Sequence, residues 1–144
     1  MKLSTRTRYG IRAIIELAQH GIEKPLQLKI IAQRQDISVK YLEQLITILK
    51  SAGFVRSIRG SKGGYILARP ADHIKLSEVF NCLEGSVTTA ECVGDKQYCE
   101  RSSDCVAREL WIEVEQAIEN VLQAITLQDL VDRARSKGTL DYQI

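Results

Sequence analysis

Hydrophobic residues recur with a helical period near the start of the chain. The first such run comprises Ile11, Ile14, Ile15 and Ala18. These residues fall at i, i+3, i+4 and i+7, which is the spacing of one apolar face on a helix. The pattern predicts a helix from about Thr5 to Gln19 that ends near Gly21.

Two further helical runs follow at short distance. A short helix is expected from Leu26 to Gln35, and the residues from Gln35 to Ser38 are typical of a tight turn with Ser38 as the next N-cap. The clearest period of the chain then comprises Leu42, Leu45, Ile46 and Leu49. Gly53 stands where a left-handed C-terminal cap is needed. Two short helices joined by a tight turn match a helix-turn-helix unit.

A glycine-rich hairpin is expected directly after this unit. The segments Phe54–Ile58 and Tyr65–Leu67 have the composition of β-strands, and Arg59-Gly60-Ser61-Lys62-Gly63-Gly64 lies between them. Glycines permit an exposed tip that can approach a nucleic-acid backbone closely. The pattern therefore favours a DNA-binding wing, with an ordinary glycine-rich surface turn as the alternative.

The second half begins with another helical run and ends with a longer one. The run from Leu76 to Leu83 stops at Gly85, and the stretch from Ser86 to Asp104 has no sustained period, so we expect it to be irregular. The segment from Arg108 to Thr126 then carries a seam formed by Trp111, Val114, Ile118, Val121 and Ile125. One seam on a helix of about five turns needs one partner. A second copy of the helix is favoured, and packing on its own domain is the alternative.

The fold class that these elements predict is mainly α with a small β-wing. It consists of a winged helix-turn-helix followed by a long C-terminal dimerisation helix. We expect a DNA-binding domain over residues 1–85 and a cysteine-bearing loop over residues 86–105. Residues 106–144 would form the dimerisation helix and a C-terminal tail.

Charge divides the chain in the same way. Residues 1–75 hold 14 Lys and Arg against five Asp and Glu, whereas residues 76–144 hold six against 13. A basic half attracts a polyanion through phosphate neutralisation, and an acidic half is repelled by one. The division favours nucleic acid as the partner of the first half.

Composition restricts the compartment and the chemistry. No apolar run approaches the roughly 18 residues of a membrane helix, and the first residues do not form a signal peptide. We therefore expect a cytoplasmic protein without a membrane partner. In that reducing compartment the four cysteines favour metal binding or thiol chemistry over disulfides. No motif of an enzyme nucleophile, metal hydrolase or nucleotide site is present, so we expect no catalytic residues.

Three of the cysteines lie close together along the chain. Cys92, Cys99 and Cys105 have the spacing C-x6-C-x5-C, which is not the paired spacing of a structural zinc site. Iron-sulfur clusters are held chiefly by cysteine thiolates and accept other ligands, so three cysteines and one further donor suffice. Carboxylates of the loop could supply that donor, as could Cys82, although Cys82 lies beside an apolar helix face and is more typical of a buried small residue.

The chain resembles the Rrf-type winged-helix regulators of bacteria, closest to the iron-sulfur cluster regulator (IscR) branch and similar also to the cysteine-metabolism repressor (CymR) branch. The stretches that carry the resemblance are Arg8-Tyr9-Gly10, Tyr41-Leu42-Glu43-Gln44-Leu45, Arg59-Gly60-Ser61-Lys62-Gly63-Gly64-Tyr65 and Thr126-Leu127-Gln128-Asp129-Leu130. The segment Arg108-Glu109-Leu110-Trp111-Ile112 resembles the CymR branch in particular. The resemblance spans nearly the whole chain and implies a dimer formed by the long C-terminal helix.

The resemblance also implies that the three cysteines ligate a cluster. It is usually [2Fe-2S] in the IscR branch and [4Fe-4S] in the nitric-oxide-sensing branch, and [2Fe-2S] is favoured here. The IscR pattern has a histidine three residues beyond the third cysteine, where this chain has Arg108. Some relatives use an acidic residue near the N-terminus, where this chain has Arg8. The fourth ligand is therefore left open.

The resemblance places Lys40, Glu43 and Arg59 at the DNA. An arginine suits bidentate contact with guanine or insertion into a narrow minor groove. A glutamate can accept a hydrogen bond from cytosine, although Glu43 could equally be a solvated helix residue. The full predicted DNA-binding set is Lys29, Ser38, Lys40, Tyr41, Glu43, Gln44, Arg56, Arg59, Ser61 and Lys62.

Two functional hypotheses follow. In the first, a homodimeric repressor binds a palindromic operator on double-stranded DNA, and an iron-sulfur cluster on Cys92, Cys99 and Cys105 controls that binding. In the second, the chain is a cluster-free repressor of sulfur or cysteine metabolism, controlled by a partner protein or by thiol oxidation. Iron analysis separates the two hypotheses.

Overall fold

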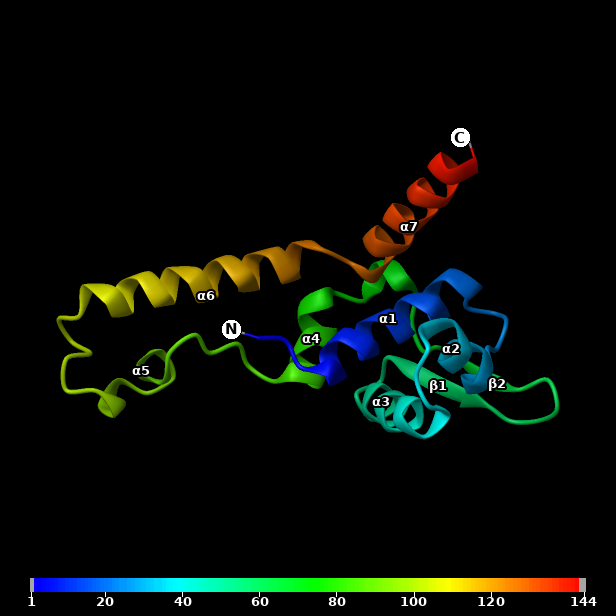
Figure 1. Ribbon diagram of the computed structural model, residues 1–144, viewed down its shortest axis with the longest axis horizontal. Helices are drawn as coiled ribbons and strands as arrows, with labels where there is room; N and C mark the ends of the chain where they lie inside the picture. The colour runs from blue at the N-terminus through cyan, green and yellow to red at the C-terminus, as the bar shows by residue number, and fades with distance from the viewer. Residues whose placement is uncertain (1, 143–144) are drawn as a thin grey trace.

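The computed structural model describes residues 2–142, with side chains through residue 138. Its elements are α1 (Thr5–His20), α2 (Leu28–Gln35), α3 (Val39–Ser51), β1 (Val55–Ile58), β2 (Gly64–Leu67), the 3-10 turn η1 (Ala71–His73), α4 (Leu76–Glu84), α5 (Glu91–Gly94), the 3-10 turn η2 (Lys96–Tyr98), α6 (Val106–Ala124) and α7 (Leu127–Tyr142). The hairpin and α5 lie at opposite ends of the elongated molecule (Figure 1).

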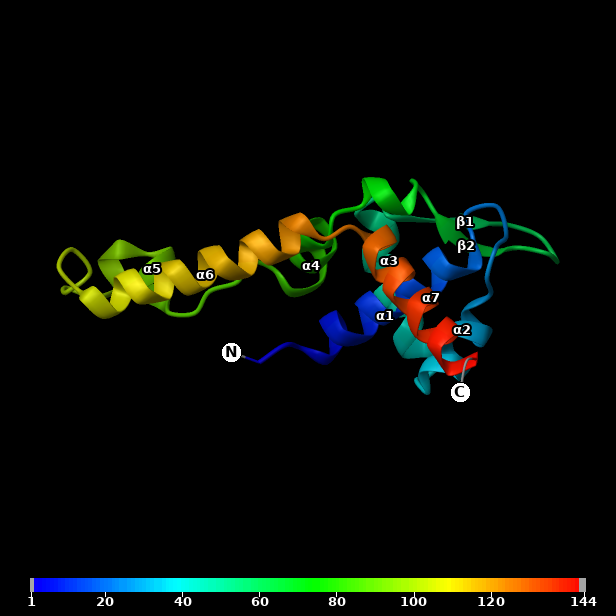
Figure 2. The ribbon, with the colours of Figure 1, turned by 90° about the horizontal axis from the view of Figure 1, so that it is seen from above.

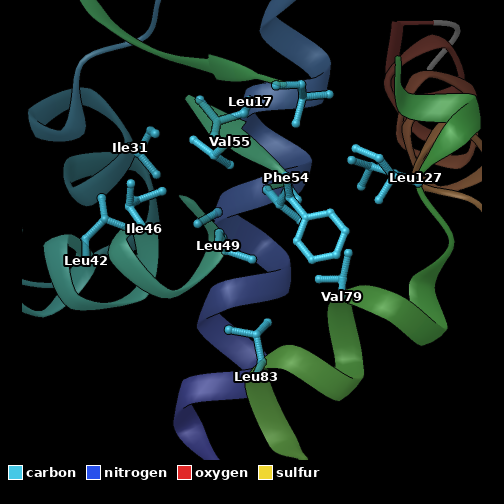
Figure 3. Close-up of a cluster of buried hydrophobic side chains, with 14 of the residues drawn as sticks. Leu17, Ile31, Leu42, Ile46, Leu49, Phe54, Val55, Val79, Leu83 and Leu127 are labelled. Atoms are coloured by element: carbon cyan, nitrogen blue, oxygen red, sulfur yellow. The ribbon is translucent and has the colours of Figure 1, made fainter. Parts of the chain in front are cut away.

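One hydrophobic core holds the first half together. Helix α1 runs through its centre and packs against α3, α4, α7 and β2. Leu17 of α1, Leu49 of α3 and Val79 of α4 are almost completely buried in it (Figure 3). Burying a side chain of this size contributes roughly 1.5–3 kcal/mol. The predicted apolar faces of the first three helices therefore converge on one another.

Short-range hydrogen bonds define the helix-turn-helix. The hydroxyl of Ser38 accepts a hydrogen bond from the Tyr41 backbone N–H at 3.0 Å, which confirms the predicted N-cap of α3. Asp36 has a left-handed backbone with φ of 53°, and its N–H donates to carbonyls at the end of α2. Helix α2 begins at Leu28, two residues later than expected, because Leu26 is held elsewhere.

The hairpin is the predicted wing, with one additional chain segment beside it. Strands β1 and β2 are antiparallel, with Val55 opposite Leu67 and Ile58 opposite Gly64. Leu26 pairs with Tyr65 through two backbone hydrogen bonds of 2.9 Å. A Cβ at Gly64 would lie 2.7 Å from the Leu26 carbonyl, so this close approach requires glycine. The wing is thereby fixed to the connection between α1 and α2.

Residues 86–124, which we call the cysteine arm, extend away from this core (Figures 1 and 2). The expectation of an irregular stretch from Ser86 to Asp104 is wrong in part, because α5 and η2 lie within it. Both are shorter than the window over which a helical period is visible. Helix α6 is the predicted long helix, but none of its 19 residues is buried.

Helix α6 ends at Ala124, earlier than its apolar pattern predicted. The expected end at Thr126 is wrong because Ile125 is extended and its carbonyl accepts from the Leu76 N–H at 2.9 Å. Thr126 and Asp129 then cap each other's backbone N–H groups, and α7 starts at Leu127. Leu127 and Val131 are buried in the core, so α7 packs on the DNA-binding half of the chain.

Candidate nucleic-acid interface and cysteine arm

The polar side of α3 faces solvent. Leu42 and Leu45 are buried on its other side, whereas Lys40, Glu43 and Gln44 are exposed. Together with Thr47 and Ile48, these three residues line a shallow hollow. The predicted recognition surface is therefore open, as a helix that enters a DNA groove requires.

Two of the predicted DNA residues also orient α3. The hydroxyl of Ser38 caps the helix, and the Tyr41 hydroxyl donates to the Thr5 hydroxyl at 3.4 Å. The ring of Tyr41 meets Tyr9 edge to face, with 6.2 Å between centroids. The sequence pattern did not predict this contact between Tyr41 and Tyr9. The Arg8-Tyr9-Gly10 motif on α1 is the signal that could have indicated it. Ser38 therefore fixes the start of the recognition helix, and Tyr41 joins that helix to α1.

The remaining predicted cations lie on other elements. Arg56 lies on β1, Arg59, Ser61 and Lys62 lie in the wing tip, and Lys29 lies on α2; all five are exposed. Within residues 2–138, no ion pair involves these four cations or Lys40. Cations without a carboxylate partner are available to phosphate groups.

The four cysteines are free thiols, and all are half-buried. Cys92 lies in α5, Cys99 follows η2, and Cys105 precedes α6 as its N-cap. Among the described residues, no three or more of His, Cys, Asp and Glu gather closely enough to hold a metal ion. The loop must therefore close further for the three predicted ligands to share a metal.

The thiols and the carboxylates of the cysteine loop differ in exposure. The three loop cysteines are half-buried, whereas the carboxylates considered as the fourth ligand are exposed. These carboxylates belong to Glu91, Asp95, Glu100 and Asp104. A hydrogen bond with Glu91 raises the pKa of Tyr98.

Arg108 takes the position where a histidine ligand was expected. Its Nε donates to the Cys92 carbonyl at 2.9 Å, and the side chain is half-buried. This hydrogen bond joins α5 to the first turns of α6. Arg108 therefore links Cys92 to α6, the helix whose N-cap residue is Cys105.

Ser102 is an unexpected polar residue between the second and third cysteines. It is only 6% exposed, and its hydroxyl oxygen is buried without a hydrogen-bond partner. Its backbone N–H donates to the Cys99 carbonyl at 3.1 Å. An unsatisfied buried hydroxyl costs about 1–3 kcal/mol. Thiols are the residue type that iron-sulfur clusters use as ligands, and the three loop cysteines are free. Burial is the only feature that identifies Ser102.

Cys82 has a different environment. It lies on α4 and packs against the hydrophobic core. Burial raises the pKa of its thiol, which favours the neutral form. This environment favours a packing role over ligation.

The segment before α5 is attached to α6, and an apolar groove lies beside the same helix. The Thr89 hydroxyl lies 3.1 Å from Oε1 of Glu115 and 3.3 Å from the Trp111 carbonyl. The groove has a volume of about 470 Å³. It is lined by Leu3, Phe80, Val114, Ala117, Ile118, Val121 and Leu122.

A helix-turn-helix followed by a wing, with exposed cations on both, defines a winged-helix DNA-binding regulator. The chain belongs to the Rrf2 family, because the family model described as an iron-dependent transcriptional regulator matches residues 3–133. Within residues 2–142 no helix is long and apolar enough to cross a membrane.

Known relatives belong to both branches that the sequence resembles. Protein rrf2 of Nitratidesulfovibrio vulgaris is 44% identical over 131 residues, which are 91% of this chain and 87% of that protein. The solved structure of CymR, the global cysteine regulator of B. subtilis, has a TM-score of 0.79 at 41% identity and covers 92% of this chain and 98% of its own. IscR of T. potens has a TM-score of 0.76 at 42% identity and covers 93% and 88%.

Proposed function

We propose that this chain is a cytoplasmic, homodimeric transcriptional repressor whose operator binding is controlled by an iron-sulfur cluster on Cys92, Cys99 and Cys105. The observation that carries the proposal is the set of three free, half-buried thiols on an arm that projects from a winged-helix domain. Membership of a family of transcriptional regulators supports the DNA-binding part.

DNA recognition is assigned to α3 and the wing. Lys40, Glu43 and Gln44 would face base edges in the major groove, and Arg59 would enter the adjacent groove from the wing. The unpaired cations on α2, β1 and the wing tip would bind phosphates and supply most of the salt-dependent affinity. These contacts suit double-stranded DNA.

The dimer is assigned to α6. A helix of 19 residues with no buried residue and with exposed Leu110, Trp111 and Val121 is incomplete as a monomer surface. A second copy of α6 would cover the groove beside Val114 and Phe80. Two-fold symmetry would then present two recognition helices to the halves of a palindromic operator.

The cluster is assigned to the arm, with [2Fe-2S] favoured. When bound, it would supply a redox-active and labile centre that responds to iron supply or oxidants. Arg108 holds Cys92 beside α6, and Glu115 holds Thr89 on the same helix. Closure of the cysteine loop would therefore act directly on the dimer helix and, through it, on the spacing of the two wings.

The test compares cluster-loaded and cluster-free protein. Anaerobically purified protein should contain iron and acid-labile sulfide and show visible charge-transfer absorption, and Cys92→Ala should abolish all three properties. Operator binding should differ between matched loaded and cluster-free samples. Cys82→Ala is the matched control and should retain the absorption. Colourless, iron-free wild-type protein would reject the cluster assignment.

A cluster-free regulator like CymR is the second candidate. It is favoured by the high structural similarity to CymR and by the three cysteines, which do not form a gathered metal group among the described residues. In this case operator binding would be unchanged by iron and would respond to a protein partner or to oxidation of the thiols. The same iron analysis therefore separates the two candidates.

A further inference from the structure

The exposed side of α3 combines polar and apolar groups. Four residues spaced i, i+3, i+4 and i+7 share this side of the helix, namely Lys40, Glu43, Gln44 and Thr47. Together with Ile48 they line the shallow hollow described above. The first three residues offer charged or amide groups to a ligand. Thr47 and Ile48 contribute apolar surface to the same hollow.

The Thr47 hydroxyl is engaged within its own helix. It donates to the Glu43 carbonyl at 2.8 Å, which is a bond that threonine makes readily to the residue four positions earlier. The Thr47 side chain is nevertheless exposed, so its methyl group is what it offers to a ligand. Ile48 is half-buried, because it packs against the core and also lines the hollow.

The major groove of DNA presents one apolar group to a recognition helix. The base edges there carry nitrogen and oxygen donors and acceptors, and the exception is the C5 methyl group of thymine. Apolar surface that covers a donor or acceptor removes its water without replacing the hydrogen bond. Apolar surface that covers a methyl group is favourable, because both surfaces leave water. The chemistry of Thr47 and Ile48 therefore fits thymine better than any other base.

We propose that Thr47 is a specificity-determining residue of α3, whose methyl group, with Ile48 beside it, contacts the C5 methyl group of one thymine in each operator half-site. The inference rests on the proposed function, since it requires α3 to enter the major groove. It extends the predicted contacts of α3 by one helical turn beyond Glu43. The competing role is a hydrogen bond from the Thr47 hydroxyl to a base.

The experiment removes the methyl group from each side of the contact in turn. A duplex is first selected with the full-length wild-type protein from a random-sequence library of double-stranded DNA. Each thymine of one half-site is then replaced singly by deoxyuridine, which lacks the C5 methyl group and keeps the same pairing edge. Fluorescence anisotropy gives the affinity for the thymine duplex and for each deoxyuridine duplex.

Two variants separate the methyl group of Thr47 from its hydroxyl. Thr47→Ser keeps the hydroxyl and removes the methyl group, whereas Thr47→Val keeps the methyl group and removes the hydroxyl. Thr88→Ser is the matched control, because Thr88 is an exposed threonine between α4 and α5, outside the recognition helix. The affinity ratio between two duplexes is measured on one protein sample, so a change in the stability of a variant does not alter it.

Wild-type protein should bind one of the deoxyuridine duplexes about fourfold more weakly than the thymine duplex, which is the factor expected for the burial of one methyl group. Thr47→Val and Thr88→Ser should show the same factor. In Thr47→Ser the factor should fall below about twofold, because the energies of two groups in contact are coupled.

Equal sensitivity to deoxyuridine in Thr47→Ser and wild type would overturn the assignment. A selected duplex without any deoxyuridine-sensitive thymine would do the same. Loss of the discrimination in Thr47→Val, with retention in Thr47→Ser, would assign the contact to the hydroxyl instead. Wild-type protein that selects no duplex rejects the proposed function itself, so that failure is distinguishable from failure of this inference.

Discussion

The DNA-binding half and the cysteine arm of this protein have different sources of stability. Helix α1 buries five of its 16 residues, α3 buries four of 13 and α4 buries five of nine. Helix α6 is longer and buries none of its residues. The two parts have similarly strong amphipathic patterns in the sequence, but only the first buries its apolar face fully within the same chain, whereas α6 packs on the core only in part, as at Leu122.

This difference teaches that an amphipathic pattern indicates a need for a partner and does not indicate where the partner lies. The core of the DNA-binding half is complete in one copy, so it should fold without the arm's partner. The arm needs a second copy, a bound group or both. Changes in the first half should therefore affect unfolding, and changes in the second half should affect assembly and ligand binding.

The largest effect is expected from a core truncation. Leu49→Ala should lower the free energy of unfolding by about 2–5 kcal/mol, because Leu49 is completely buried and leaves a cavity. Val121→Ala on α6 is the matched comparison, and in monomeric protein it should change unfolding by less than about 0.5 kcal/mol. Urea denaturation at low protein concentration measures both. Equal losses would break the distinction between the two regions.

A substitution on α6 should affect dimer formation and leave the folding of the winged-helix domain unchanged. Val121→Glu places a charge in the apolar groove beside α6 and should convert a dimer to a monomer, which analytical ultracentrifugation detects. The winged-helix domain should keep its far-ultraviolet circular dichroism, since Val121 is 58% exposed. Persistence of the dimer would place the second copy elsewhere.

The wing should affect DNA affinity alone. Arg59→Ala should weaken operator binding by about 1–3 kcal/mol and relax specificity if Arg59 contacts a base. Lys62→Ala should weaken all sequences alike and reduce the salt slope by about 1 if Lys62 contacts a phosphate. Fluorescence anisotropy at several salt concentrations measures both variants, and unchanged affinity in Arg59→Ala would remove this residue from the interface.

Loosening the arm should give a smaller effect. Arg108→Ala removes the hydrogen bond to the Cys92 carbonyl, which is worth about 0.5–1.5 kcal/mol. Alkylation of Cys92 in metal-free protein should then be roughly 2- to 10-fold faster, because the arm opens more often. Arg101→Ala, at an exposed position, is the control. Mass spectrometry of the alkylated peptides shows whether the change is confined to the arm.

The smallest effect concerns the junction between the two regions. The Ser4 and Thr7 hydroxyls donate to Glu84 and hold the pKa of its carboxyl below the usual range. A lowered pKa in the folded state gives stability that is present above the unfolded pKa and is lost as the pH falls through the folded pKa. Glu84→Gln should therefore reduce the loss of stability on acidification, which urea titrations at neutral and acidic pH measure.

Much of the DNA-binding half could be predicted, because there the local sequence signals favour the same elements that the hydrophobic core requires. The Leu42 to Leu49 period, the Ser38 cap and the glycines of the wing each indicate a structure that the core then uses. Helix α7 was missed because its buried residues are few, although Thr126 followed by Asp129 has the spacing of a capping box. The early end of α6 was missed because the apolar seam continues through Ile125 into an extended segment.

The cysteine arm was predictable only in part. Cysteine spacing identifies three candidate ligands, but α5 and η2 are too short to produce a visible period. The hydrogen bond from Arg108 to Cys92 and the burial of the Ser102 hydroxyl depend on how residues 86–108 fold. Neither residue type is distinctive in sequence, so both features need coordinates.

The return of the chain at Ile125 has an evolutionary consequence. The segment leaves the DNA-binding half after Gly85 and comes back where Ile125 and Leu127 bond to Leu76 and Ile74. The arm is therefore inserted between two helices of one folding unit. Such an insertion can change in length or sequence during evolution while the DNA-binding domain stays unchanged. In this way, one ancestral DNA-binding domain can give rise to regulators whose inserted arms respond to different chemical stimuli.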